Sequence, residues 1–154
     1  MGLWYRVFGA NDAQPDPAAL LEHLRGQGLN VVGQFRGDDQ GWFAAALSFA
    51  DGGTPVHLER YLAGEEGIRH DLNSWAAWLE TADYSPNHGE FMRRVIATTQ
   101  LFTLRRPVDH SNEILVEKVC VAVCQYLAQE TAGMYQVDDE GFFAPDGTLL
   151  LKEY

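Results

Sequence analysis

The sequence predicts an α+β fold, with a single antiparallel or mixed sheet and helices packed on one face of it. Segments with strand character follow one another across short turns and are interspersed with helical segments, in the order β-α-β-β-β-α-α-β-α-β-β. Hairpins mixed with helices are typical of this class. The segment from Asn112 to Ala132 is apolar around most of its circumference. A helix of this kind must be covered on more than one side, so we expect it to lie centrally on the sheet with other helices beside it.

Length and composition indicate one domain spanning residues 1–154. A chain of 154 residues fits the usual size of a single domain, and a domain of this size buries roughly 68–70% of its unfolded surface. The formal net charge is −11, from 22 acidic and 11 basic residues. This charge repels phosphate backbones, which argues against a nucleic-acid partner. It favours a basic protein as the partner and leaves homo-oligomerisation open.

The first strand and the first helix are predicted from their apolar pattern and their caps. Leu3 to Phe8 carries large apolar side chains on both faces, as an interior strand does. A helix then begins with Asp16 as its N-cap and Pro17 at the first helical position. Gly26 or Gly28 ends this helix.

A meander of three strands follows, at Leu29–Arg36, Trp42–Phe49 and Thr54–Leu62. The first two strands are separated by Gly37–Gly41, a loop length common in hairpins. Pro55 lies near the start of the third strand, which indicates an edge position or a strand end because proline cannot donate a ladder hydrogen bond.

Two helices are predicted next, at Glu65–Ala82 and His88–Thr98, because their apolar residues recur at helical spacing. The rest of the chain is read as a strand, the long helix, a short strand and a terminal hairpin. Their bounds are Gln100–Arg106, Asn112–Ala132 with Ser111 as N-cap, Met134–Val137, and Phe142 to Lys152 around a Pro-Asp-Gly turn.

Cys120 and Cys124 are the only cysteines, and they lie one helical turn apart on one face. They cannot join distant parts of the chain, and a structural zinc site would need further ligands that the sequence does not supply. We therefore expect two buried, inert thiols, with no metal and no cofactor. Free thiols suit a reducing, cytoplasmic location. The N-terminus lacks the pattern of a signal peptide, and no segment is apolar enough to cross a membrane.

Known catalytic patterns are missing from the sequence, which favours a protein that is not an enzyme. There is no Gly-x-Ser-x-Gly and no glycine-rich phosphate loop. His57 and Glu59 form a His-x-Glu triplet, but the Pro-Cys-x-x-Cys segment that accompanies such a triplet in zinc deaminases is missing. On a strand these two side chains share a face, and we interpret them as a structural pair.

The strongest candidate for ligand binding is the junction between the strand that ends at Arg106 and the long helix. Arg105 and Arg106 are followed by Pro107 and His110. Helix N-termini favour anions, and arginine binds carboxylates and phosphates bidentately. The junction, with His88 as a further candidate, therefore predicts a site for an anionic small molecule. The alternative is that the arginines form structural ion pairs with the many acids.

Tyr61 and Trp78, with Trp75, form a concentration of aromatic residues. Exposed apolar patches often mark interaction sites, so Tyr61 and Trp78 are candidates for an interaction surface. The alternative is that they pack in the core.

The end of the chain, from Met134 to Leu150 (MYQVDDEGFFAPDGTLL), resembles the ends of uncharacterised bacterial conserved hypothetical proteins, within a likeness confined to the C-terminal third. Some of those resemble immunity-type small domains of toxin systems. The resemblance implies a bacterial protein and transfers no functional residue. The acidic charge, the aromatic surface candidates and the missing catalytic patterns favour a non-enzymatic, acidic protein-interaction domain, immunity-like or regulatory. The alternative is a small enzyme or ligand-binding domain that uses Arg105, Arg106 and His110.

Overall fold

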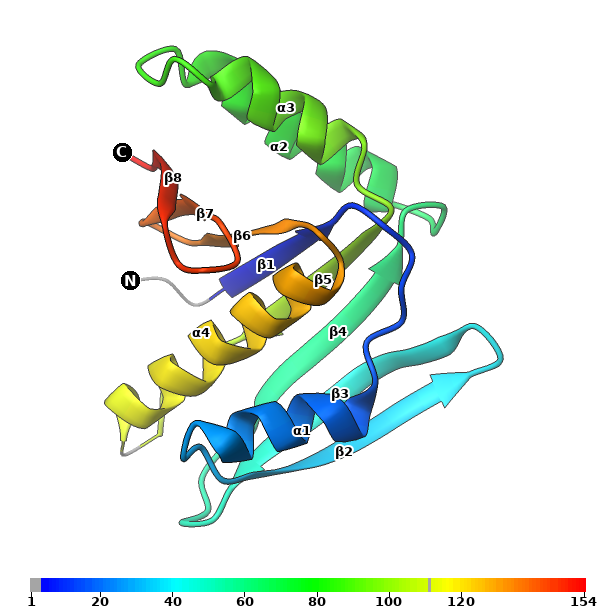
Figure 1. Cartoon of the computed structure of the whole chain (residues 1–154), viewed down its shortest axis with the longest axis vertical. Coiled ribbons are helices and arrows are strands. Elements are labelled where there is room, and N and C mark those ends of the chain that lie inside the picture. Colours follow the sequence, from blue (N-terminus) through cyan, green and yellow to red (C-terminus); the bar gives the residue numbers. More distant parts are fainter. Residues whose placement is uncertain (1–3, 111) are drawn as a thin grey trace.

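The computed structural model describes residues 4–110 and 112–154, and this part of the chain forms one antiparallel sheet with four helices. The α+β class is thereby confirmed (Figure 1). In chain order the elements are β1 (Trp4–Gly9), α1 (Pro17–Gly26), β2 (Val31–Asp38), β3 (Gly41–Phe49), β4 (Val56–Leu62), α2 (Ile68–Thr81), α3 (His88–Ile96), β5 (Gln100–Arg105), α4 (Glu113–Glu130), β6 (Met134–Val137), β7 (Gly141–Phe143) and β8 (Leu149–Lys152). The predicted order is matched except that the C-terminus holds one strand more.

The sheet combines strands from both ends of the chain, in the order β2-β3-β4-β5-β1-β6-β7-β8. β1 lies between β5 and β6, as expected for a strand that is apolar on both faces. The predicted start of this strand at Leu3 lies outside the described residues. β4 is also an interior strand, between β3 and β5. It begins at Val56, so Pro55 marks a strand end and not a sheet edge.

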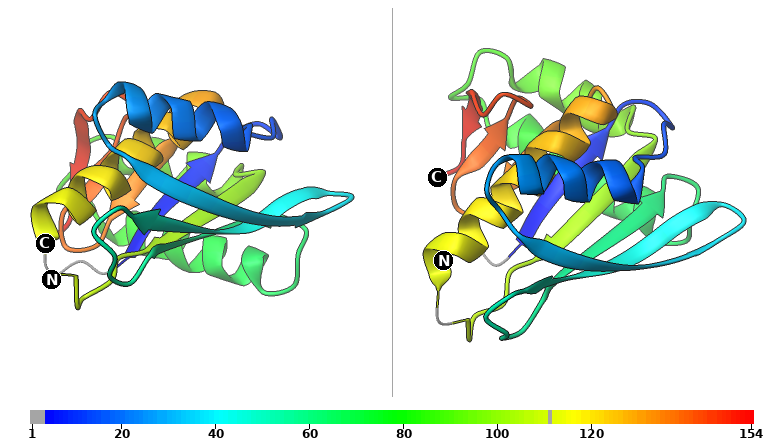
Figure 2. Two further views of the ribbon diagram at one scale, coloured as in Figure 1. Left: turned by 90° about the horizontal axis from the view of Figure 1, so that it is seen from below. Right: turned by 60° about the horizontal axis from the view of Figure 1, so that its bottom comes forward.

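One face of the sheet is covered by α1 and α4 (Figure 2). Side chains from the interior strands and from both helices form the larger core cluster, which includes Tyr5, Val7, Leu20, Leu24, Leu58, Phe102, Leu104, Val119, Val123 and Leu127. Burying one such side chain fully contributes about 1.5–3 kcal/mol. Eight residues of α4 are buried, among them both cysteines, so the prediction of a central, widely covered helix is confirmed.

The capping of α4 differs in detail from the prediction. Its N-cap is Asn112, whose side-chain oxygen accepts a hydrogen bond from the backbone N–H of Leu115 at 3.1 Å. The predicted cap, Ser111, lies outside the described residues. None of the helices in the described chain combines the length and the apolar character needed to cross a bilayer.

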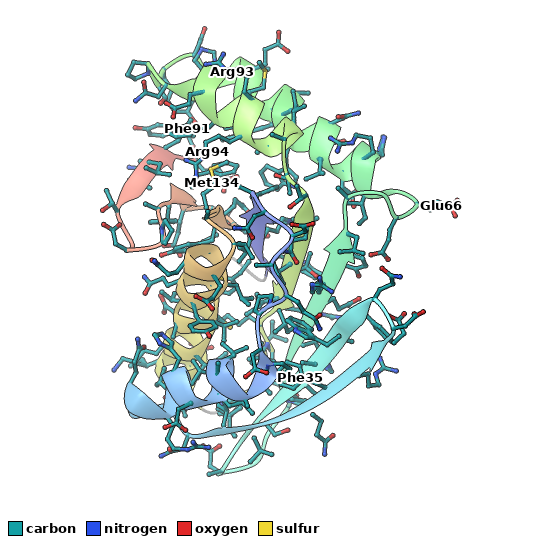
Figure 3. The ribbon with its side chains drawn as sticks, turned by 45° about the vertical axis from the view of Figure 1, so that its right-hand side comes forward. Phe35, Glu66, Phe91, Arg93, Arg94 and Met134 are labelled. Carbon is teal, nitrogen blue, oxygen red and sulfur yellow. The ribbon has the colours of Figure 1, made fainter. Side chains whose placement is uncertain are left out.

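The prediction that the helices pack on one face alone requires correction, because α2 and α3 cover part of the opposite face (Figure 2). A second core cluster joins them to the sheet, and Figure 3 shows Phe91 of α3 and Met134 of β6 on the sides of helix and sheet that face each other. Its other members include Phe8, Leu72, Leu79, Val95, Leu101 and Phe142. Helical periodicity identifies the buried stripe of a helix, but it carries no information about which face of the sheet that stripe covers.

The second predicted helix also begins later than expected, at Ile68 instead of Glu65. The side-chain carboxylate of Glu65 accepts a hydrogen bond from the backbone N–H of Leu62. Gly67 then adopts a positive φ of 84°, a conformation that glycine reaches without steric cost. These two residues form the turn that brings the start of α2 back over the sheet.

Candidate functional site

The part of the sheet that α2 and α3 leave uncovered carries polar side chains in cross-strand rows. Because side chains alternate between the faces along a strand, the paired positions identify one row as Gln34, Ala46, His57, Arg105 and Trp4. The next row on the same face consists of Arg36, Ala44, Glu59, Thr103, Arg6 and Gln136. We call this surface the open face.

Three adjoining hollows run along the open face. The first lies between α2 and strands β4, β5 and β1, and has a volume of about 580 Å³. A second hollow of about 390 Å³ lies over β2, β3 and β4 and shares Glu59 with the first. A third, also of about 390 Å³, lies at the end of β5 and shares His57 with the second. We call them the α2 hollow, the middle hollow and the arginine hollow. Neighbouring hollows therefore adjoin at one residue each.

The α2 hollow combines carboxylates with aromatic rings. Its walls carry three carboxylates and one guanidinium, and its aromatic side chains come from a strand at each side and from α2. The residues concerned are Glu59, Glu66, Asp71 and Arg6, with Trp4, Tyr61 and Trp75. Within the described chain, none of the three carboxylates takes part in a salt bridge. Figure 3 shows Glu66 at the outer tip of the connection between β4 and α2, where it is open to an approaching molecule.

The one cation of the α2 hollow, Arg6, is already neutralised. Its Nη1 donates hydrogen bonds to Gln136 Oε1 at 2.8 Å and to Asp138 Oδ1 at 2.7 Å. Its guanidinium lies 4.9 Å from the ring centroid of Trp75, within cation–π distance. The hollow therefore keeps a negative potential, and Trp75 already contacts a guanidinium on one side.

Glu59 is held in place by its neighbour on β4. The hydroxyl of Tyr61 donates a hydrogen bond to Glu59 Oε2. Burial of the phenol, reinforced by this bond, raises the pKa of Tyr61 to about 12. The phenol thus stays protonated at neutral pH and fixes the carboxylate where the α2 hollow and the middle hollow meet.

Both predicted arginines line the arginine hollow, but their side chains lie on opposite faces of the sheet. Arg105 lies on the open face with its guanidinium 5.9 Å from the Trp4 ring centroid. Arg106 follows on the α4 side, as strand alternation requires. There burial raises the pKa of Cys120 to about 12, and the positive charge of Arg106 opposes that rise. Burial also raises the pKa of Glu140, and the charge of Arg106 opposes that rise.

The predicted histidines do not join the arginines. His110 is buried, its ring centroid lies 4.5 Å from that of Phe49, and its Nδ1 accepts a hydrogen bond from the N–H of Asn112. Its Nε2 lies 3.6 Å from Asp51 Oδ1 and has no hydrogen-bond partner among the described residues. The Nδ1 of His88 lies 2.9 Å from the carbonyl oxygen of Leu79 and joins α3 to α2. Of the four predicted ligand residues, only the two arginines lie together.

The predicted interaction residues also separate. Tyr61 lines the α2 hollow. Trp78 stacks on Phe142 of β7, with ring centroids 6.1 Å apart, and is partly buried between α2 and the C-terminal strands. Trp75, whose ring meets that of Trp78 edge-on with centroids 6.1 Å apart, lines the α2 hollow together with Tyr61.

Metal and thiol chemistry find little support in the described chain. No group of three or more His, Cys, Asp or Glu side chains there is arranged to hold a metal ion. Both cysteines are free and buried, and burial raises the pKa of each thiol. The prediction of two dry thiols is confirmed, since both residues are 0% exposed.

Sequence reasoning did not select Arg6 or Asp71, because they belong to no motif and come from elements far apart in the chain, and it noted Trp75 only as a neighbour of Tyr61 and Trp78. One usable signal was present. His57 and Glu59 alternate with buried Val56 and Leu58 along β4, which indicates that one face of an interior strand is left to solvent.

Comparison of the chain with models of protein families, with curated protein sequences and with solved structures finds no match in any of the three. The resemblance of the segment from Met134 to Leu150 to bacterial conserved hypothetical proteins therefore stays a prediction. The geometry of the open face is the basis on which function has to be argued.

Proposed function

We propose that this chain is a non-enzymatic protein-interaction domain that binds a basic segment of a partner protein in the α2 hollow. The observation that carries the proposal is the set of three carboxylates, Glu59, Glu66 and Asp71, which line one hollow and form no salt bridge within the described chain. Lysine or arginine side chains are the protein groups that complement such a surface.

Two physical effects favour this partner. Carboxylates around a depression focus the electrostatic potential and speed the approach of a cation, and the net charge of −11 adds to this attraction. The rings of Trp4, Tyr61 and Trp75 line the same hollow, and aromatic faces attract a guanidinium or ammonium group. A basic side chain would therefore gain both an ionic and an aromatic contact.

The shape of the open face favours an extended segment. Neighbouring hollows adjoin at Glu59 and at His57, so an extended peptide could follow them from α2 across β4 to the end of β5. An immunity-like or regulatory domain that neutralises a basic protein fits this binding chemistry. We propose a reducing, cytoplasmic compartment for it because both thiols are free.

A second candidate function is the binding of a small anion in the arginine hollow. Arg105 and Arg106 line it together with Thr54 and His57, and paired guanidiniums recognise carboxylate or phosphate. Arg105 lies on the open face and Arg106 on the α4 side. A single anion could meet both guanidiniums only at the end of β5, so this candidate stands behind the first.

The test is a titration of a fluorescein-labelled peptide of alternating lysine and threonine residues, followed by fluorescence anisotropy. The variant Glu59→Gln/Glu66→Gln/Asp71→Asn removes the three charges and keeps the side-chain shapes. Since exposed ion pairs contribute about 0.5 kcal/mol each, we expect roughly tenfold weaker binding. Inorganic phosphate, titrated separately, tests the arginine hollow.

The matched control is Asp12→Asn/Glu80→Gln/Glu113→Gln, which removes one aspartate and two glutamates outside the open face. Both triple variants lose three of the same kind of charge, so long-range attraction falls equally. The proposal predicts that the control loses clearly less affinity for the peptide than the variant of the α2 hollow does. Equal weakening in both variants would reduce the effect to net charge and reject the site.

A further inference from the structure

Arg60 is a buried charge without a carboxylate in contact. It lies on the interior strand β4 and is only 6% exposed. Its Nε donates to Gln100 Oε1 at 2.8 Å, and its Nη1 donates to the carbonyl oxygens of Trp42 at 3.1 Å and Gln40 at 3.3 Å. All three acceptors are neutral, and Arg60 forms no salt bridge within residues 4–110 and 112–154. Buried arginines are normally paired with an acid.

Part of this guanidinium makes no hydrogen bond within the described chain. Arginine has five N–H donors, and the three hydrogen bonds above leave the two N–H groups of Nη2 without an acceptor in the described chain. Among the described residues, the buried side-chain atom that lacks a hydrogen-bond partner is His110 Nε2. Nη2 of Arg60 lacks a partner as well but is not among the buried atoms, so it keeps some contact with solvent. Arg60 lines a hollow of about 260 Å³ at the hairpin between β2 and β3. We call it the hairpin hollow.

The hairpin hollow presents opposite charges across a small space. Its walls hold Asp38 and Glu65 in addition to Arg60. Burial lowers the pKa of Arg60, while the charges of Glu65 and Asp38 raise it. Each carboxylate is fixed by a backbone N–H, that of Gln40 for Asp38 and that of Leu62 for Glu65. These bonds hold the two carboxylates in the walls while leaving acceptor capacity on both.

The hairpin hollow also has an apolar side. Trp42, Phe43 and Leu62 line it beside Gln40 and Gly41, and Phe43 is 41% exposed. The volume of about 260 Å³ lies just below the range of roughly 300–1,000 Å³ that suits drug-sized ligands. The hollow therefore offers the remaining Arg60 donors for a carboxylate, two acceptors for an ammonium group and an apolar surface, within a space for a small molecule.

We propose that the hairpin hollow binds a free α-amino acid with an apolar side chain, its carboxylate on Arg60 and its ammonium group on Asp38 and Glu65. A ligand that is only an anion meets two carboxylates, and one that is only a cation meets the guanidinium. A zwitterion satisfies both sides at once. This site is separate from the α2 hollow and does not depend on the proposed function.

The test uses L-phenylalanine and L-leucine as probes, with two analogues of phenylalanine that each lack one charge. The analogues are 3-phenylpropionate, which has no ammonium group, and phenethylamine, which has no carboxylate. Binding is followed by two-dimensional amide NMR of the full chain. We expect saturable shifts at Asp38, Gln40 and Glu65, and binding of each analogue about ten- to a hundredfold weaker, because each loses its charge-assisted hydrogen bonds.

Two variants test whether Asp38 and Glu65 bind the ammonium group of the ligand. Asp38→Asn/Glu65→Gln keeps an acceptor for each backbone N–H, and we expect it to weaken phenylalanine binding about tenfold or more while strengthening that of 3-phenylpropionate. Asp39→Asn, next to Asp38 but outside the hollow, is the matched control and should bind as the unmodified chain does. These variants leave Arg60 in place, so the test does not depend on folding without it.

Three results would overturn the inference. The first is that neither amino acid gives saturable shifts. The second is that 3-phenylpropionate binds as tightly as phenylalanine, which would make the hollow a plain anion site. The third is that the shifts lie away from the β2–β3 hairpin.

Discussion

The two faces of the sheet are built from the same strands but have different surroundings. Under α1 and α4, the side chains of β4 and β5 are sealed, and Leu58 and Leu104 are 0% exposed. One residue away on each strand, His57 and Arg105 are exposed on the open face. The comparison indicates a division of roles, in which the covered face supplies most of the stability and the open face is available for binding.

The polar composition of the open face supports that division. Buried apolar surface stabilises a fold by roughly 25 cal/mol per Å², so a strand face with Glu59 and Thr103 gives up part of this gain. α2 and α3 recover some of it at one end, through Leu72, Leu79 and Phe91. The predictions below break or sharpen the contrast, from the largest effect to the smallest.

The largest effect is expected from a cavity on the covered face. Leu104→Ala removes a side chain that is 0% exposed, and we expect a loss of about 2–5 kcal/mol in the free energy of unfolding. The matched change on the open face, Thr103→Ala, should cost less than about 1 kcal/mol. Urea denaturation followed by circular dichroism measures both. Similar losses for the two variants would remove the contrast.

The end of α4 should tolerate no added side chain. A Cβ on Gly133 would lie 2.1 Å from the carbonyl oxygen of Phe8 in β1, so Gly133→Ala must displace either the helix end or the strand. We expect a loss of about 1–3 kcal/mol in unfolding free energy. The control is Gly26→Ala in α1, where a Cβ meets nothing within 4 Å. Thermal unfolding of the two variants tests this prediction. A Gly133→Ala variant as stable as the unmodified chain would contradict the close contact between Gly133 and β1.

A smaller effect is expected from removing Arg6, the arginine of the open face that forms an ion pair with Asp138. Arg6→Met removes the ion pair with Asp138 and the hydrogen bond to Gln136. Since both charged side chains keep 20–28% of their surface exposed, we expect a loss of about 1–2 kcal/mol. Arg36→Met on β2, whose guanidinium lies over the Phe43 ring, is the control and should lie within about 0.5 kcal/mol of the parent. Urea titration compares the two variants.

The smallest effect concerns alkaline pH. Tyr61 has a pKa of about 12 in the fold against an ordinary value of 10, so its neutral form is favoured in the folded state. This contribution is complete below pH 10 and is lost as the pH rises to about 12. We expect Tyr61→Phe to lose less stability than the parent across that window, measured by urea denaturation at several pH values. Parallel curves for the two proteins would show that Tyr61 does not contribute.

Much of the fold could be predicted because its signals are local. The strand predicted at Trp42–Phe49 is observed at Gly41–Phe49, and the helix predicted at Asn112–Ala132 is observed at Glu113–Glu130. Alternation and helical periodicity depend on neighbours in the chain. The side of the sheet on which α2 packs depends on contacts with Phe8 and Met134, which the local pattern does not encode.

The candidate site was harder to predict for the same reason. The α2 hollow takes Arg6 from β1, Glu59 from β4 and Asp71 from α2. Of these, only Glu59 stands out in its own segment, and there it pairs with His57 and not with the other two. Adjacent residues of one strand, such as Arg105 and Arg106, attract attention in the sequence. Strand alternation then directs them to opposite faces, and only the arginine hollow at the strand end touches both.

The central claim is that the open face, and not the covered one, binds a basic segment. The most direct measurement is an amide NMR map of the chain titrated with the lysine–threonine peptide. The account predicts that the largest shifts fall on Glu59, Asp71 and Thr103, around the α2 hollow. Shifts concentrated on α1 and α4 instead, with the open face unchanged, would contradict it.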